Sequence, residues 1–271
     1  VALKHLVPDG TANAGVLAPI EIVIPENSLL SAQPPRPVGG DTETILRIID
    51  VVFAAFGKID PNRALGNSYG TINALSLAGH REDKSRWVMF SFFGGGHGAH
   101  ASGDGLSHGN APISMATIPP LEILEAAYPI AFRKWALRKD SGGPGINRGG
   151  LGATYQIEVL GQNAVGFFFG ERGKYAPCGV SEGRSAALNR FSWKKNGLDP
   201  QNFPALTSKI VDINLDLGGS VLLETPGGGG YGNPLARSPE KVKEDLRFGY
   251  ISEEHMRKYY GVVLSDEKSI D

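Results

Sequence analysis

Trp87-Val-Met-Phe-Ser-Phe-Phe-Gly-Gly-Gly-His-Gly-Ala-His100 joins an unbroken apolar run to a glycine-rich loop. The run from Trp87 to Phe93 predicts a β-strand, because continuous apolar runs of this length are typical of buried strands. The glycines that follow let the backbone approach a ligand closely, and they expose N–H donors that suit an oxyanion or a phosphate. The junction therefore predicts a strand that leads into a loop able to carry chemistry.

The composition is that of a globular protein with an unusual share of glycine. Hydrophobic residues make up 41% of the 271 residues and charged residues 20%, both ordinary values. The 37 glycines are the exception, because average proteins contain roughly 7% glycine. They cluster in short runs without a regular period, which excludes collagen and indicates tight turns. The formal net charge of -1 gives no electrostatic case for binding nucleic acid or an acidic membrane.

Cysteine content and hydropathy bear on the location of the protein. The single cysteine, Cys178, allows no intrachain disulfide and indicates a reducing compartment, so we expect a cytoplasmic protein. No stretch reaches the ~18 apolar residues that a membrane span needs. The chain begins at Val1 rather than at a methionine, which we interpret as the result of a split gene, a cleavage or a fragment.

The remaining patterns predict an α+β fold, that is, a mixed α/β body. A helix is expected from Asp41 or Thr42, the candidate N-cap, to Gly57. Further helices are expected over 118–127, 238–247 and 252–260, the last two beginning after Ser238 and Ser252. Strands are expected over 20–24, 87–93, 130–138, 153–160, 164–170, 208–214 and 219–224.

This pattern divides the chain into three parts. Residues 1–128 form a mixed α/β part that carries the glycine- and histidine-rich loop, residues 129–235 form a β-rich part, and residues 236–271 form a C-terminal helical tail. We expect these parts to make one continuous unit that is incomplete without an N-terminal partner segment.

The loop from Gly94 to Asn110 holds the densest set of chemical groups. It contains three of the six histidines, His97, His100 and His108, together with Asp104. Imidazole and carboxylate groups together suit proton transfer or a divalent metal, so these four are the candidate catalytic residues. The spacing matches no standard zinc motif, and a glycine-rich loop with hydrogen-bonded structural histidines is the alternative.

Other candidate residues would bind the substrate through the backbone or through side chains. Besides the glycines Gly94, Gly95 and Gly96, they are Asn110, Arg148 and Tyr231. Arg148 lies in a turn-rich loop, where it suits a carboxylate or phosphate, or pairs with Asp140 to brace the loop. Tyr231 lies in a run of glycines, where it is suited to cover a pocket. The sequence contains no Gly-Lys-Ser/Thr motif and therefore no phosphate-binding loop of that type.

Seven landmarks in order give the chain a family resemblance. They are Ala12-Asn13-Ala14-Gly15 with Ala18-Pro19-Ile20, Gly39-Gly40-Asp41-Thr42-Glu43-Thr44, Gly94-Gly95-Gly96-His97-Gly98-Ala99, Asp104-Gly105, Pro120-Leu-Glu-Ile-Leu-Glu125, Asp140-Ser141-Gly142-Gly143 with Arg148-Gly149-Gly150, and Glu224-Thr-Pro-Gly-Gly-Gly-Gly-Tyr-Gly-Asn-Pro234. Over nearly its whole length the chain resembles the C-terminal half of hydantoinase B. That family includes the B-type subunits of hydantoinases and oxoprolinases, and subunits of acetone and acetophenone carboxylases.

The resemblance implies a division of labour between subunits. A hydantoinase A-type subunit would bind ATP and Mg²⁺ and phosphorylate the substrate, and the B-type subunit would then hydrolyse the activated cyclic amide. The alternatives are an ATP-dependent ketone carboxylase and a non-catalytic scaffold half of such a complex. Zn²⁺ or Mn²⁺ accompanies some members, and the resemblance places the metal ligands in an N-terminal half that this sequence lacks. We therefore expect a separate chain that carries that half, and no stable monomer of this chain alone.

Overall fold

The computed structural model describes residues 13–114 and 116–264. Ala12, which belongs to the first family landmark, lies outside these residues. The described part contains two four-stranded antiparallel sheets, with helices toward the N-terminus and near the C-terminus, so the expected α+β fold is confirmed. No helix within it is long and apolar enough to cross a membrane.

The helices and strands have the following bounds. The helices are α2 (Asp41–Ile59), α3 (Leu121–Ala127), α4 (Pro239–Arg247), α5 (Glu253–His255), a π-helical turn (Met256–Tyr260) and four 3₁₀ turns (Ala14–Val16, Leu29–Ser31, Pro61–Arg63, Pro234–Ala236). The strands are β1 (Ala74–His80), β2 (Arg86–Phe92), β3 (Ile130–Leu137), β4 (Ala153–Val159), β5 (Gln162–Phe169), β6 (Arg190–Lys194), β7 (Lys209–Leu215) and β8 (Ser220–Glu224).

The two sheets pack face to face as a sandwich. Their strand orders are β2-β1-β5-β7 and β3-β4-β8-β6. The first sheet pairs β1 and β2 with β5 and β7, and so joins strands from both sides of residue 128. Side chains that alternate along each strand fill the space between the sheets, as the two-residue period of a strand requires. Phe168 of one sheet stacks on Phe191 of the other, with ring centroids 4.4 Å apart.

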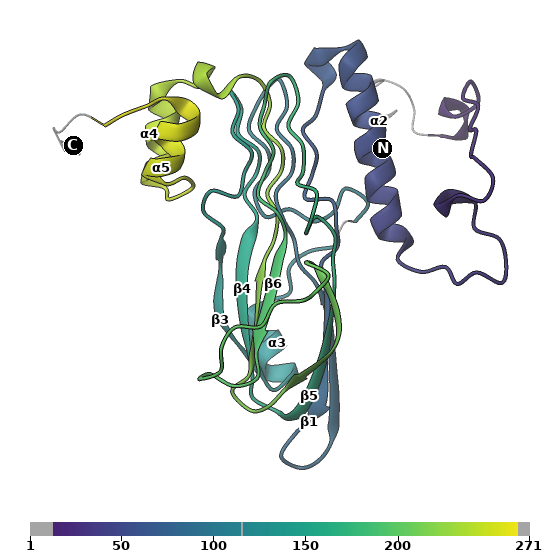
Figure 1. Cartoon of the computed structure of the whole chain (residues 1–271), viewed down its shortest axis with the longest axis vertical. Helices are drawn as coiled ribbons and strands as arrows, with labels where there is room; N and C mark the ends of the chain where they lie inside the picture. Colours follow the sequence, from purple (N-terminus) through teal and green to yellow (C-terminus); the bar gives the residue numbers. More distant parts are fainter. Residues whose placement is uncertain (1–12, 115, 265–271) are drawn as a thin grey trace.

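Glycine-rich segments extend from one end of the sandwich and run side by side without forming strands (Figure 1). We call them the glycine bundle; they are residues 64–70, 94–110, 141–152, 177–187 and 225–232. Segment 225–232 pairs with all the others. Gly228 bonds to Gly150 and Gly143, Gly229 to Asn67 and Ala99, Gly230 to Arg184 and Val180, and Tyr231 returns to Asn147.

Gly228 and Tyr231 both pair with segment 141–152, whereas Gly229 and Gly230 between them pair with other segments. Successive residues of the segment therefore point their hydrogen bonds in three directions, toward three sets of neighbours. The segments also lie too close together for side chains. A Cβ atom on Gly228 would lie 1.9 Å from the carbonyl oxygen of His97, and one on Gly230 would lie 2.2 Å from that of Pro144. This is the physical reason for the glycine runs in the sequence.

Helix α2 packs on one side of the bundle through polar groups. Glu43 accepts hydrogen bonds from the Thr71 hydroxyl (3.1 Å) and the Ile72 amide (2.8 Å). Asp50 forms an ion pair with Arg172, which follows β5. Burial raises the pKa of Glu43, and it lowers the pKa of Arg172 to about 10. These contacts fix α2 against loops far away in the sequence.

Helices α4 and α5 form a small hydrophobic unit on the other side of the bundle (Figure 1). Val242, Ile251, Met256 and Tyr260 make its core. The side chains of Ser238 and Ser252 cap the two helices by accepting the amides of Lys241 and His255, so both expected helix starts are confirmed.

Several sequence-based boundaries were wrong. Residues 20–24 form no strand and are exposed, because no neighbouring strand pairs with them. The first helix continues through Gly57 to Ile59, and its N-cap is Gly40, whose φ of 67° suits glycine. Strands β1 and β6 were not predicted at all. The expected strand 87–93 is β2, but it alternates between buried and exposed residues because only one face of its sheet is covered.

Candidate functional site

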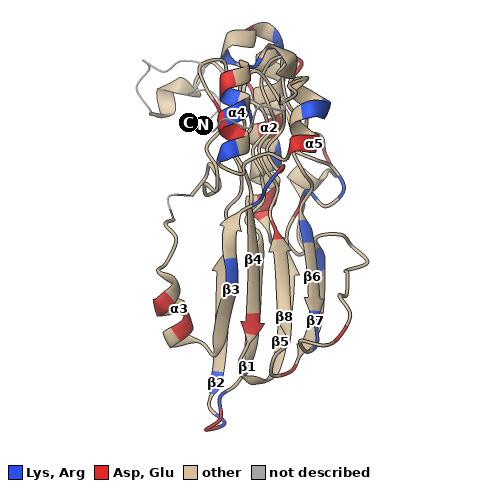
Figure 2. Cartoon of the chain, turned by 90° about the vertical axis from the view of Figure 1, so that its left-hand side faces the viewer, with Lys and Arg blue, Asp and Glu red and all other residues tan. Residues whose placement is uncertain are grey.

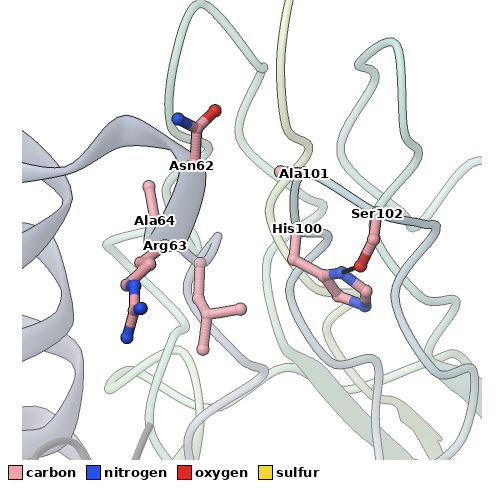
Figure 3. A pocket seen from close by; sticks show the side chains of 7 residues that line it. Asn62, Arg63, Ala64, His100, Ala101 and Ser102 are labelled. Atoms are coloured by element: carbon pink, nitrogen blue, oxygen red, sulfur yellow. Dashed lines mark hydrogen bonds between the residues drawn. The ribbon is translucent and has the colours of Figure 1, made fainter. Parts of the chain in front are cut away.

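His100 lies at a hollow between the glycine bundle and the 3₁₀ turn Pro61–Arg63 that follows α2 (Figure 3). The hollow has a volume of about 430 Å³. Its lining residues are Asn62, Arg63, Ala64, Leu65, His100, Ala101 and Ser102. The Nδ1 atom of His100 is 2.8 Å from the Ser102 hydroxyl, and either group can be the donor in this pair. Of the four candidate catalytic residues, His100 is the one that lines this hollow.

A second hollow adjoins the first, because Asn62 and Ala101 line both. Its volume is about 440 Å³, and Tyr231 is part of its wall. The Tyr231 hydroxyl donates to the carbonyl of Pro61 at 3.1 Å, which links the bundle to the 3₁₀ turn. His100 and Tyr231, 131 positions apart in the sequence, thus line two hollows that share a wall.

His97 is half-buried and holds the loop together. Its Nε2 atom is 2.6 Å from the carbonyl oxygen of Asn110, which can only accept, so Nε2 carries a proton. Burial lowers the pKa of His97, and the neutral ring is therefore the favoured form near pH 7. The predicted binding residue Asn110 is occupied by this contact and by its own side-chain bonds to Ala111 and Ala116.

His108 points toward the sandwich. Its Nε2 atom lies 2.9 Å from the Trp135 indole nitrogen and 2.6 Å from the Tyr155 hydroxyl. An indole N–H only donates, so Nε2 must accept and the ring is neutral. Burial again lowers the pKa of this histidine. His108 also has a φ of 52°, a left-handed backbone conformation that is unusual for a residue other than glycine.

Asp104 and Arg148 belong to an ion network that holds the α4–α5 unit on the bundle. Arg237 forms two bonds to Asp104, of 2.7 and 2.8 Å, and contacts Asp245 at 2.9 Å. Arg148 contacts Asp245 at 3.3 Å and lies over the ring of Tyr250. Burial alone would raise the pKa of Asp104, but Arg237 and Arg148 outweigh it and hold this pKa below its usual value.

The expected alternative for Arg148, a pair with Asp140, is wrong. Arg148 contacts Asp245, whereas Asp140 accepts the amide of Ser252 at 2.7 Å. The candidate glycines are also engaged within the chain. The amide of Gly95 donates to Gly109, that of Gly96 donates to Pro226, and the carbonyl of Gly94 accepts the Tyr155 hydroxyl at 3.4 Å.

The hollow includes residues that the sequence did not single out. Asn62 and Arg63 lie in the 3₁₀ turn after α2, and Ser102 lies two residues from His100. Asn62 and Arg63 stand outside every motif, and only their position after the helix could have drawn attention to them. Within the described part of the chain, no group of three or more His, Cys, Asp or Glu side chains is arranged to hold a metal ion.

Comparison with known proteins decides the family. Residues 1–234 match the family described as Hydantoinase B/oxoprolinase. The chain belongs to this family. The putative B-type subunit of a D-/L-hydantoinase from Pseudomonas sp. (strain NS671) is 29% identical over 279 residues, which cover 100% of this chain and 46% of that protein.

Two solved structures of related proteins share the fold. The ATP-dependent caprolactamase from Pseudomonas jessenii matches with a TM-score of 0.85 at 24% identity, over 100% of this chain and 48% of that chain. Acetone carboxylase in a nucleotide-free state matches with a TM-score of 0.62 at 24% identity, over 82% of this chain and 33% of that chain. This member of the hydantoinase B family therefore spans about half the length of the hydantoinase and caprolactamase chains that it matches.

Proposed function

We propose that this chain is the C-terminal half of a B-type subunit in an ATP-dependent complex that hydrolyses a phosphate-activated cyclic amide. The observation that carries the proposal is the match of residues 1–234 to the hydantoinase B/oxoprolinase family. The likeness to a putative hydantoinase over the whole chain supports the amide-hydrolysing branch. The single cysteine supports a cytoplasmic location, and the proposed use of ATP agrees with it.

The proposal assigns the first step to a partner. An A-type subunit would bind ATP with Mg²⁺ and transfer a phosphoryl group to the carbonyl oxygen of the ring, since this chain has no Gly-Lys-Ser/Thr loop. Phosphorylation of the oxygen makes the ring carbon more electrophilic. Water then adds to this carbon and the ring C–N bond breaks, which leaves an acyl phosphate, and a second water hydrolyses the acyl phosphate to a carboxylate and inorganic phosphate. The B-type subunit would guide this second step.

His100 is the residue of this chain that we assign to proton transfer in the second step. It lines a hollow, and its Nδ1 atom bonds the Ser102 hydroxyl, whereas no hydrogen bond of its Nε2 atom is seen among the described residues. An imidazole in this position can take a proton from water and return it to the leaving ring nitrogen. Tyr231 would line the path for the substrate in the adjoining hollow.

In this scheme the other three candidate residues hold the loop in place and do not react themselves. They are His97, His108 and Asp104. Each is bound to groups within the chain, and together they fix the two ends and the middle of the loop that presents His100. The described residues contain no group of three or more His, Cys, Asp or Glu side chains that fits a Zn²⁺ or Mn²⁺ site, so we assign no metal ligand among them.

A scaffold without chemistry of its own is the second candidate. The observation that favours it is that three of the four candidate catalytic side chains are engaged in structural contacts. The scaffold and the hydrolase make different predictions for His100, because only the hydrolase needs that side chain.

The substrate panel tests the proposed reaction. The complex is purified with all its co-eluting chains, and ADP release is measured with cyclic amides and, separately, with ketones plus bicarbonate. We expect ADP release and ring opening that depend on a cyclic amide. Turnover that requires both ketone and bicarbonate would instead make the complex a carboxylase and overturn the proposal. The absence of turnover with both sets of substrates would also overturn it.

A further inference from the structure

The outer face of the sheet β2-β1-β5-β7 is apolar over β2, β1 and β5, whereas on β7 the exposed Asn214 pairs with Val165. Val88, Phe90 and Phe92 point outward from β2 and are 56%, 55% and 51% exposed. On β5, Val165 and Phe167 are 43% and 38% exposed. The rings of Phe90 and Phe92 meet edge to face at 5.0 Å between centroids, and the ring of Phe90 lies 6.3 Å from that of Phe167.

The apolar face continues across β1, which lies between β2 and β5. Ser76 pairs with Phe90 on one side and with Phe167 on the other, and Ala78 pairs in the same way with Val88 and Val165. The small side chains of β1 let the large side chains from both neighbours meet over it. A continuous apolar surface of this kind marks an interaction site when it appears on a soluble domain.

The outer face of the other sheet is polar. It carries charged or amide side chains on each of its strands, as Figure 2 shows for the charged ones. They are Lys134, Gln156, Glu158, Arg190, Lys194 and Glu224. An antiparallel sheet commonly has one face on the core and one in water, and this sheet follows that rule. The sheet β2-β1-β5-β7 departs from it on the opposite side of the same sandwich.

Helix α2 extends the apolar surface. Ile45, Ile48 and Ile59 lie at heptad positions on its outward side and are 39%, 42% and 79% exposed. The start of α2 adjoins the sheet, because a Cβ atom on Gly40 would lie 3.2 Å from the ring of Phe169. A stripe with this spacing is the pattern by which one helix packs on another element.

The segment before α2 shares this exposure. Residues 13–40 run beside α2 on the side of the molecule that holds β1 and β5 (Figure 1). Ile22 and Val23 are 72% and 79% exposed, and their neighbour Ile24 is also exposed. These three consecutive apolar residues are therefore not covered by any other segment in the described part of this chain.

We propose that the outer face of the sheet β2-β1-β5-β7 and the outward stripe of α2 form one interface, which binds the polypeptide equivalent to the half of the B-type subunit that this chain does not span. The occupant is argued from length: the chain covers 46% and 48% of two related proteins, so a B-type subunit of their length would contain about as much polypeptide again. The position follows from the contrast between the two outer faces. This inference rests on the proposed function only for the identity of the partner.

The test is association. The chain is co-expressed with the polypeptide from the same source whose sequence matches the missing half, and the complex is isolated through a tag on this chain. The triple variant Val88→Thr, Phe90→Thr and Phe167→Thr is compared with Lys134→Thr, Gln156→Thr and Lys194→Thr on the polar face. We expect the first variant to lose the partner by more than tenfold and the second to retain it, with both keeping the wild-type circular dichroism spectrum.

A second variant guards against misfolding of the first. The double variant Ile48→Gln and Ile59→Gln changes exposed positions of α2 and should also weaken binding of the partner. In a separate measurement, carbene footprinting of the wild-type complex should show that residues 45–59 and 88–92 are protected. The inference would be overturned if all variants recovered the partner equally. It would also be overturned if the chain formed a homodimer that dissociates in the triple variant Val88→Thr, Phe90→Thr and Phe167→Thr. Because the readout is binding, a complex that forms but turns over no cyclic amide would refute the proposed function and leave this inference standing.

Discussion

The two ends of the molecule are held together by opposite means. In the sandwich, side chains such as Met89 and Phe168 fill the space between the sheets, and backbones lie far apart. In the glycine bundle, backbones touch directly, and Gly228 leaves no room for a methyl group. The stability of the sandwich depends on apolar side chains that fill its interior. The stability of the glycine bundle depends on the absence of side chains where its backbones touch.

The two kinds of packing serve different purposes: the sandwich stabilises the fold, and in our proposal the glycine bundle positions the functional residue His100. The sandwich needs only apolar residues at alternate positions, whereas the bundle needs particular residues at particular places, since each segment meets several neighbours. A loop so constrained presents His100 in one position without a helix or strand beneath it. The comparison can be tested by adding atoms at one end and removing them at the other.

The largest effect is expected from Gly228→Ala. The new methyl group would lie 1.9 Å from the His97 carbonyl oxygen and 2.0 Å from its carbon, so two backbone segments must separate. We expect a loss of about 5 kcal/mol or more in the free energy of unfolding, measured by urea denaturation, or failure to fold. The control is Gly39→Ala, where nothing lies within 4 Å, and equal effects of the two changes would contradict the account of the bundle.

A slightly smaller effect is expected from Asp245→Asn, which breaks the network between the bundle and the α4–α5 unit. Arg148 and Arg237 are 5% and 2% exposed and would be left without a full counter-charge. Removal of one partner from a buried ion pair typically costs about 3–5 kcal/mol. The control is Glu253→Gln, which breaks the exposed pair with Arg257 and should change thermal stability little.

A moderate effect is expected at the sandwich from Met89→Ala. Met89 is fully buried between the sheets, and the cavity should cost about 3 kcal/mol. Its neighbour Phe90 points outward, so Phe90→Ala should cost under about 1 kcal/mol in the isolated chain. Similar losses for the two variants in urea denaturation would show that the outer face is covered in the isolated protein.

The smallest effect is a pH dependence that arises in the loop. Burial lowers the pKa of His97 and of His108, so the unfolded chain binds their protons at a higher pH than the folded chain does. Stability from these neutral rings is present above the unfolded value of about 6.5 and is lost as the pH falls below it. The slope should be at most about 1.4 kcal/mol per histidine for each pH unit.

Denaturation curves from pH 8 to pH 5 measure this slope. His108→Gln should reduce it, because this variant removes one of the two rings whose pKa burial lowers. A slope that stays the same in His108→Gln would show that this ring does not titrate differently in the folded chain.

Much of the fold could be predicted from local patterns. The helices with clear caps and the strands from Ile130 onward, apart from β6, follow from apolar periodicity and from glycine-rich turns. β1 was missed because Ala74-Leu-Ser-Leu-Ala-Gly-His80 is rich in small residues, and β6 because Arg190-Phe-Ser-Trp-Lys194 is short and polar. Residues 20–24 have the right composition for a strand, but their pairing depends on neighbours that composition does not reveal.

The site could be predicted only as a region. The density of histidines singled out the loop from Gly94 to Asn110, of which His100, Ala101 and Ser102 line a hollow, and a functional site there stays a prediction. The sequence could not distinguish the role of His100 from those of His97 and His108. The difference lies in tertiary contacts: His97 contacts the carbonyl of Asn110, and His108 contacts Trp135. For the same reason, the partner of Arg148 was sought nearby in Asp140 rather than in Asp245.

The central claim, that this chain contributes chemistry to the second step, is tested most directly by His100→Ala in the purified complex. ADP release and ring-opened product are measured together with the cyclic amide that the wild type accepts. The account predicts that ADP release persists while product falls by at least roughly 100-fold, the usual range for loss of a general acid–base group. Product formation at the wild-type rate would contradict the claim and leave this chain as a scaffold.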